Sequence, residues 1–181
     1  PYSTNYSKQF NNFCIVKGDV GFARTFFKKL ALNVQTEAGF AIGEKSVPYF
    51  DFVLGGYGYN TINNFRHFYW YDFLSLAGDS YIKSTVTVDY EFLKKNHINA
   101  SANFANIEDN LFESTKWISS PQYSGYALGY GLETIIGPIE LKYTWSPETG
   151  KGLVWFNIGF WFWYFCKKLW NKAFIWFLKI N

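Results

Sequence analysis

Few residues in this chain have the types and spacing that metal binding or redox chemistry requires. Cys14 and Cys166 lie far apart and form no Cys-x-x-Cys pair. His67 and His97 likewise lack the spacing of metal ligands. We therefore expect no metal site and no cofactor, and we interpret both histidines as solvated or facing a polar lumen.

A serine nucleophile is the other chemistry to consider. Hydrolases of the Gly-x-Ser-x-Gly type expose their serine on a sharp turn between a strand and a helix. The nearest sequence here, Gly78-Asp79-Ser80, lacks the second glycine and stands where a strand is expected to begin. We interpret Ser80 as structural, predict no catalytic residue, and do not expect this part of the protein to be an enzyme.

Composition and charge narrow the class of protein. Aromatic residues make up 23% of the chain, an abundance that membrane barrels use at their interfaces with water. The net charge is +3, but Lys167, Lys168, Lys172 and Lys179 all lie in the last nineteen residues. Without those four, acidic residues outnumber basic ones by one, so no nucleic-acid partner is expected.

The stretch from Gly152 to Phe162 carries no charge and alternates like a lipid-facing strand. The alternative is a transmembrane helix, but the uncharged run from Gly152 to Cys166 is shorter than the ~17–25 residues that a helical span needs. A strand is therefore favoured. Its predicted lipid face consists of Val154, Phe156, Ile158, Phe160 and Phe162.

Further stretches alternate in the same way and are separated by turn residues. Predicted strands cover residues 12–20, 30–43, 81–92, 97–104, 123–136 and 139–145, with a basic turn at 23–29. A long extracellular loop is predicted at about 44–79. A soluble β-sandwich would also alternate. Charged residues in the middle of the polar faces, and Tyr and Trp near the strand ends, favour an outer-membrane barrel instead.

The segment Gly131-Leu132-Glu133-Thr134-Ile135-Ile136-Gly137-Pro138-Ile139-Glu140-Leu141-Lys142-Tyr143 resembles the penultimate hairpin of the bacterial surface antigen superfamily. That superfamily contains the barrels of outer-membrane assembly factors. Leu54-Gly55-Gly56 is similar to the double glycine before the superfamily's sixth extracellular loop. The tip of that loop, usually Arg-Gly-aromatic, is not matched: the nearest candidates, Arg66-His67-Phe68 and Tyr69-Trp70-Tyr71, lack the glycine. The resemblance implies the C-terminal half of a sixteen-stranded antiparallel barrel, an all-β fold.

Two longer phrases, Ser80 to Phe92 and Asn103 to Phe112, resemble the C-terminal barrel of bacterial patatin-like phospholipases. This resemblance implies a membrane anchor or translocation domain for an N-terminal lipid hydrolase that is missing here. The alternative is the barrel of an assembly or translocation factor.

We therefore divide the chain into a partial barrel, residues 1–162, and a basic aromatic tail, residues 163–181. The tail is either a short amphipathic helix at a membrane surface or an extension without a selected role. The chain lacks methionine and starts at Pro1, so we expect a fragment. The expected location is the bacterial outer membrane. Expected partners are outer-membrane lipid, the barrel assembly machinery and the missing N-terminal part of the protein.

Overall fold

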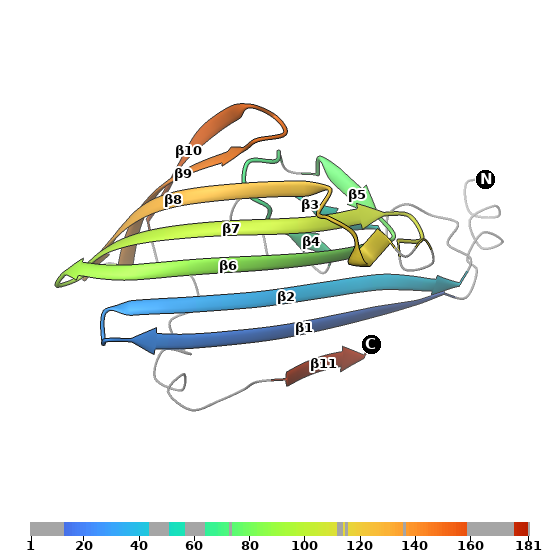
Figure 1. Cartoon of the computed structure of the whole chain (residues 1–181), viewed down its shortest axis with the longest axis horizontal. Helices are drawn as coiled ribbons and strands as arrows, with labels where there is room; N and C mark the ends of the chain where they lie inside the picture. The colour runs from blue at the N-terminus through green and yellow to red at the C-terminus, as the bar shows by residue number, and fades with distance from the viewer. Residues whose placement is uncertain are drawn as a thin grey trace, which may run out of the picture.

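The computed structural model describes residues 13–43, 51–56, 64–72, 74–111, 114, 116–135, 137–158 and 176–180. Its main feature is one antiparallel sheet with the strand order β10-β9-β8-β7-β6-β2-β1-β11 (Figure 1). The strands of this sheet are β1 (Phe13–Phe26), β2 (Leu30–Gly43), β6 (Ser80–Leu93), β7 (Asn96–Glu108), β8 (Tyr123–Thr134), β9 (Gly137–Ser146), β10 (Lys151–Ile158) and β11 (Trp176–Ile180).

Alternation along the strands divides the sheet into two chemically different faces. On β6, Lys83 is buried and inward, whereas Val88 and Tyr90 are exposed and outward. The paired register continues this arrangement across the sheet, because residues opposite each other in neighbouring strands share a face. The inward face is polar and the outward face apolar, which is the reverse of a soluble sheet that packs on a core. The all-β antiparallel prediction is thus confirmed.

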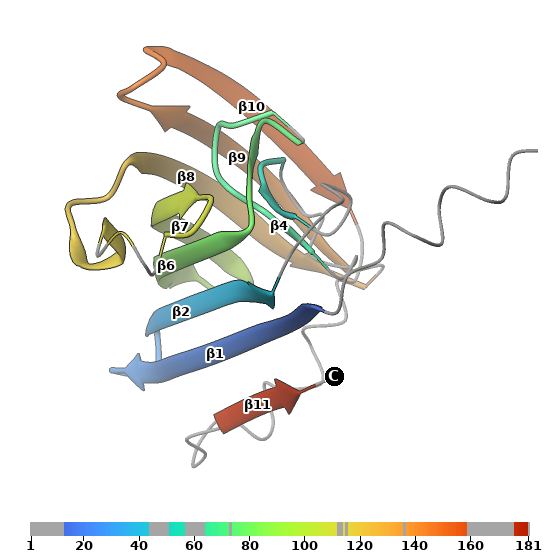
Figure 2. The same cartoon turned by 90° about the vertical axis from the view of Figure 1, so that its right-hand side faces the viewer.

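The sheet is curved, and the segment between β2 and β6 lies on its concave side (Figure 2). This segment contains three short strands, β3 (Phe52–Leu54), β4 (Phe65–Arg66) and β5 (Leu76–Gly78). They form a small sheet in which β3 pairs parallel to β4 and antiparallel to β5. A 3-10 turn, η2 (Lys116–Ile118), lies in the connection between β7 and β8, at the same end of the sheet as β5 (Figure 1). Among the described residues, no helix has the length and apolar character to cross a membrane.

Several predicted boundaries need correction. The basic turn expected at 23–29 is confined to residues 27–29, because β1 stays paired with β2 as far as Phe26. β7 extends to Glu108, since Ala105 and Ile107 pair with β6 and pack inward. Within the long loop, β3, β4 and β5 form short strands. In the tail, Trp176–Ile180 forms β11 on the edge of β1, so the amphipathic helix is wrong for these residues. Residues 163–175 lie outside the described residues.

Candidate functional site: a loop docked inside the curved sheet

The double glycine at the end of β3 turns the long loop back on itself. Gly55 and Gly56 have φ angles of 138° and 69°, which L side chains rarely adopt. A Cβ atom on Gly55 would lie 2.0 Å from the carbonyl oxygen of Asp72. Gly55 donates its N–H to the carbonyl of Arg66 at 3.1 Å, and Gly56 donates to that of Tyr71 at 2.7 Å. The glycines therefore permit the backbone contacts that hold Arg66 in place.

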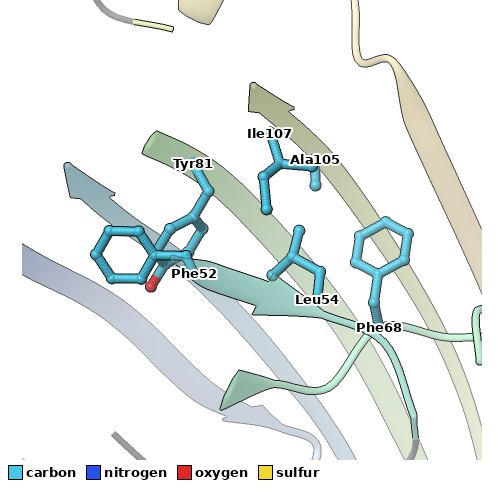
Figure 3. Packing of buried hydrophobic residues seen from close by; sticks show 6 residues of the cluster. All are labelled: Phe52, Leu54, Phe68, Tyr81, Ala105 and Ile107. Atoms are coloured by element: carbon cyan, nitrogen blue, oxygen red, sulfur yellow. The ribbon is translucent and has the colours of Figure 1, made fainter. Parts of the chain in front are cut away.

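An apolar cluster attaches the loop to the inner face of the sheet (Figure 3). From the loop come Phe52, Leu54 and Phe68, each at most 1% exposed. The sheet contributes Tyr81 from β6 and two residues from β7, Ala105 and Ile107. The Phe52 and Tyr81 rings lie 4.8 Å apart between centroids. Full burial of each large side chain contributes about 1.5–3 kcal/mol, so this cluster is a substantial anchor.

Space for these rings comes from glycines on the inward face of the sheet. A Cβ on Gly39 of β2 would lie 2.7 Å from both Phe52 and Tyr81 ring atoms. A Cβ on Gly125 of β8 would lie 2.4 Å from the carbonyl oxygen of Tyr69 in the loop. The loop backbone and its aromatic side chains thus contact the sheet where the sheet has no side chain.

Arg66 carries the polar part of the docking. Its Nε lies 2.8 Å from Glu37 Oε2 on β2, and Glu37 Oε1 accepts a hydrogen bond from Lys83 Nζ on β6 at 3.2 Å. Lys83 is 1% exposed and Glu37 is 7% exposed. Burial alone would lower the pKa of Arg66, but Tyr81 and Glu37 outweigh burial and raise this pKa above its ordinary value. One buried carboxylate therefore holds two cations, one from the loop and one from the sheet.

A second set of contacts holds the other side of the loop. The Lys142 ammonium of β9 lies 5.6 Å from the centroid of the Tyr69 ring and 2.9 Å from Glu140 Oε1. The hydroxyl of Tyr71 lies 3.4 Å from that of Ser146, and its ring packs edge-on against Tyr123. The loop thus spans the concave face from β2 to β9.

His67, His97 and Ser80 were considered for chemistry in the sequence, and in the structure each lies among neighbouring charged or polar groups. Burial lowers the pKa of His67 well below its ordinary value, and Lys83, Lys142 and Arg66 lower it further. His97 faces inward, with Nδ1 2.8 Å from Asp89 Oδ2 and Nε2 3.6 Å from Glu133 Oε1. Ser80 is buried and donates a hydrogen bond to Asp79 at 2.6 Å.

The structure does not bring the remaining predicted site residues together. Gly131, Gly137 and Pro138 lie in the β8–β9 hairpin, where Gly137 has a φ of 119° and pairs with Thr134. The predicted lipid-face residues Val154, Phe156 and Ile158 are outward on β10 and more than half exposed. Phe160 and Phe162 lie outside the described residues. Leu54, Gly55, Gly56 and Arg66 are the predicted residues that meet at the docked loop.

Glu37 and Lys83 are functional candidates that sequence reasoning did not single out. Alternation places both on inward faces, but the sequence does not show that β2 and β6 pair in a register that sets Glu37 opposite Lys83. In the part of the chain that the structure describes, no group of three or more His, Cys, Asp or Glu could hold a metal ion. The arrangement is suited to holding the loop against the inward face of the sheet.

Comparison with known proteins gives one family and one fold. The sequence profile described as the OMP85 superfamily matches residues 1–162. No curated protein gives a significant match to the chain. A solved structure titled "The crystal structure of BamA from Haemophilus ducreyi lacking POTRA domains 1-3" superposes with a TM-score of 0.52 at 10% identity. The alignment covers 75% of this chain and 31% of that chain, so this chain spans about a third of its length.

Proposed function

Since this chain belongs to the OMP85 superfamily, we propose that it forms part of the outer-membrane barrel of a protein assembly or translocation factor. In that role the outward apolar face of the sheet contacts lipid. The polar inward face lines the lumen, and the loop from β3 to β5 occupies that lumen. We assign no reaction to the described residues.

The observation that carries this proposal is the docked loop. A passive pore needs an open lumen, whereas here an apolar cluster holds the loop against β6 and β7, and the Arg66–Glu37 ion pair holds it against β2. A loop held mainly by one carboxylate and a few aromatic rings can be released as a unit. Such a release would open the lumen or the sheet without unfolding the strands.

The second candidate is the barrel of a patatin-like phospholipase. It rests on the two phrases that resemble that family, Ser80 to Phe92 and Asn103 to Phe112. In this function the same barrel anchors or exports a lipid hydrolase encoded upstream, and the docked loop closes the lumen after export. The family match names no phospholipase, so it supports the first candidate better than the second.

The nucleotide sequence upstream of Pro1 discriminates between them first. Repeated periplasmic modules would support an assembly or translocation factor, and a Gly-x-Ser-x-Gly elbow followed by an Asp-Gly pair would support the phospholipase. The functional test uses the full-length protein in proteoliposomes. An assembly factor accelerates the protease-protected insertion of a second, urea-unfolded barrel, and Arg66→Gln, which weakens the docking of the loop, changes the rate of this insertion. Release of fatty acid from phospholipid without any acceleration would contradict the proposal.

A further inference from the structure

Three short turns come together at the end of the sheet opposite the long loop, at the left in Figure 1. They are residues 27–29 between β1 and β2, 94–95 between β6 and β7, and the β8–β9 turn, to which Ile135 belongs. Hydrogen bonds fix two of the turns to the next hairpin. Glu91 donates its N–H to the carbonyl of Lys29 at 2.8 Å, and Glu133 donates to that of Lys95 at 2.9 Å. The side chains of the three turns thus form one continuous rim.

This rim is basic. Lys28, Lys29, Lys94 and Lys95 are all exposed, and none forms an ion pair with another described residue. Arg24, two residues before the end of β1, adds a fifth positive charge. It faces outward on β1, with its guanidinium carbon 5.1 Å from the centroid of the Phe26 ring. Five cations therefore lie where the outward face of the sheet ends.

The acidic residues at this end of the sheet do not neutralise the positive charge of the rim. Glu91 faces inward, and its Oε1 accepts a hydrogen bond from the backbone N–H of Lys95. Asp89 and Glu133 also face inward and flank His97. Negative charge is thus directed to the lumen, while positive charge is directed to the rim and to the outward face.

Large apolar side chains stand beside the cations. Phe27 is 92% exposed, Leu93 60% and Ile135 97%. Phe27 and Lys95 have φ angles of 49° and 65°, a conformation that is unfavourable for residues with a side chain. In short turns between strands, positions with this conformation are usually occupied by Gly or Asn. Exposed aromatic and basic residues at such positions are typical of a surface that meets the lipid–water interface.

We propose that this basic rim, formed by Arg24, Lys28, Lys29, Lys94 and Lys95, binds anionic phospholipid headgroups, with Phe27, Leu93 and Ile135 inserted among them. In outer-membrane barrels the short turns face the periplasm, so the partner is the phospholipid of the inner leaflet. Charge complementarity selects the partner, because exposed lysines at a membrane surface attract anionic lipid and the apolar tips prefer the headgroup boundary. The inference rests on the sheet spanning the membrane and not on what the barrel transports.

The test measures lipid selectivity in bilayers of phosphatidylcholine that contain the full-length protein. Spin-labelled phosphatidylglycerol and spin-labelled phosphatidylcholine are compared by the fraction of each that the protein surface immobilises. We expect a preference for phosphatidylglycerol that weakens as salt is raised. Lys28→Gln with Lys29→Gln, or Lys94→Gln with Lys95→Gln, should lower that preference several-fold, since one lysine at an anionic surface corresponds to about a fivefold change in affinity.

Two controls keep the result interpretable. Lys116→Gln with Lys151→Gln removes the same charge at the opposite end of the sheet and should leave the preference unchanged. Lys94→Arg with Lys95→Arg keeps the charge in the same turn and should also retain it. A preference that is absent in the wild type, or that falls equally in the opposite-end variant, overturns the proposal. Loss in the arginine variant would overturn it as well.

Discussion

Replacing Glu37 by Gln should release the docked loop. Glu37 is the one carboxylate within ion-pair distance of both Arg66 and Lys83 among the described residues. Its removal leaves Lys83, at 1% exposure, as a buried cation without its partner carboxylate. Breaking a buried pair from one side costs about 3–5 kcal/mol. Arg66→Gln should cost less, roughly 1–2 kcal/mol, because Arg66 is 22% exposed and Glu37 keeps Lys83.

For Glu37→Gln, which keeps the cleavage site, the assay is trypsin cleavage after Arg66 in the full-length protein reconstituted in lipid; the effect of Arg66→Gln, which removes that site, is measured by urea unfolding. Cleavage there requires the loop to leave the sheet, and its rate follows the population of the released state when release is fast. A loss of ~3 kcal/mol raises that population by about two orders of magnitude, so Glu37→Gln should be cut much faster than the wild type. Glu108→Gln is the matched control, because its partner Lys116 is more than half exposed, and it should change cleavage little.

A second variant separates loss of the ion pair from the cost of the unpaired cation. In Glu37→Gln with Lys83→Gln the buried charge is removed as well, so a large part of the lost stability should return. The reasoning is refuted if Glu37→Gln is cut at Arg66 no faster than wild type. It is also refuted if adding Lys83→Gln makes the loop still less stable.

Further predictions concern the loop and the two faces of the sheet. Gly55→Ala should release the loop even with Glu37 intact, at a cost of about 1–3 kcal/mol for the backbone conformation plus the overlap with Asp72, and the same trypsin assay measures it. Leu54→Ala should cost about 2–5 kcal/mol in urea unfolding, because Leu54 is fully buried. The lowered pKa of His67 means that the unfolded chain takes up its proton first as pH falls, so stability should be full above about pH 6.5 and decline below it; His67→Gln should flatten this decline in urea titrations. Phe156→Lys should lower the stability of the folded barrel by up to about 2–4 kcal/mol, whereas Asn157→Lys on the other face should be tolerated. The fraction of heat-resistant folded barrel measures both variants, and equal losses would contradict the assignment of faces.

The strands could be predicted wherever alternation was clean. The range 30–43 predicted for β2 matches the structure at both ends, because apolar and polar residues alternate through its whole length. The predicted strand at 12–20 is too short because residues 23–29, which include Arg24, were interpreted as a basic turn. In the structure Arg24 stays in the strand and packs on Phe26, as a long side chain can at a membrane boundary.

The docked loop could be predicted only in part. The double glycine marks it in the sequence, since only glycine fits the φ of Gly55 and the close approach of Asp72. The partner of Arg66 could not be predicted, because it depends on the register of β2 against β6 and on the curvature of the sheet. His67 follows Arg66 where the resemblance led us to expect glycine, yet Arg66 still reaches Glu37. The strand at Trp176–Ile180 was also not predicted, because its pairing with β1 joins opposite ends of the chain.

We infer that the sheet faces lipid on one side and encloses the loop on the other. The most direct measurement is a nitroxide scan of β6 from position 82 to position 91 in the full-length protein in a bilayer, comparing collisions with oxygen and with a water-soluble nickel complex. We predict high oxygen accessibility at positions 82, 86, 88 and 90 and low oxygen accessibility at 83, 85, 87 and 89. Accessibility that does not alternate, or nickel accessibility that is high on both faces, would contradict the account.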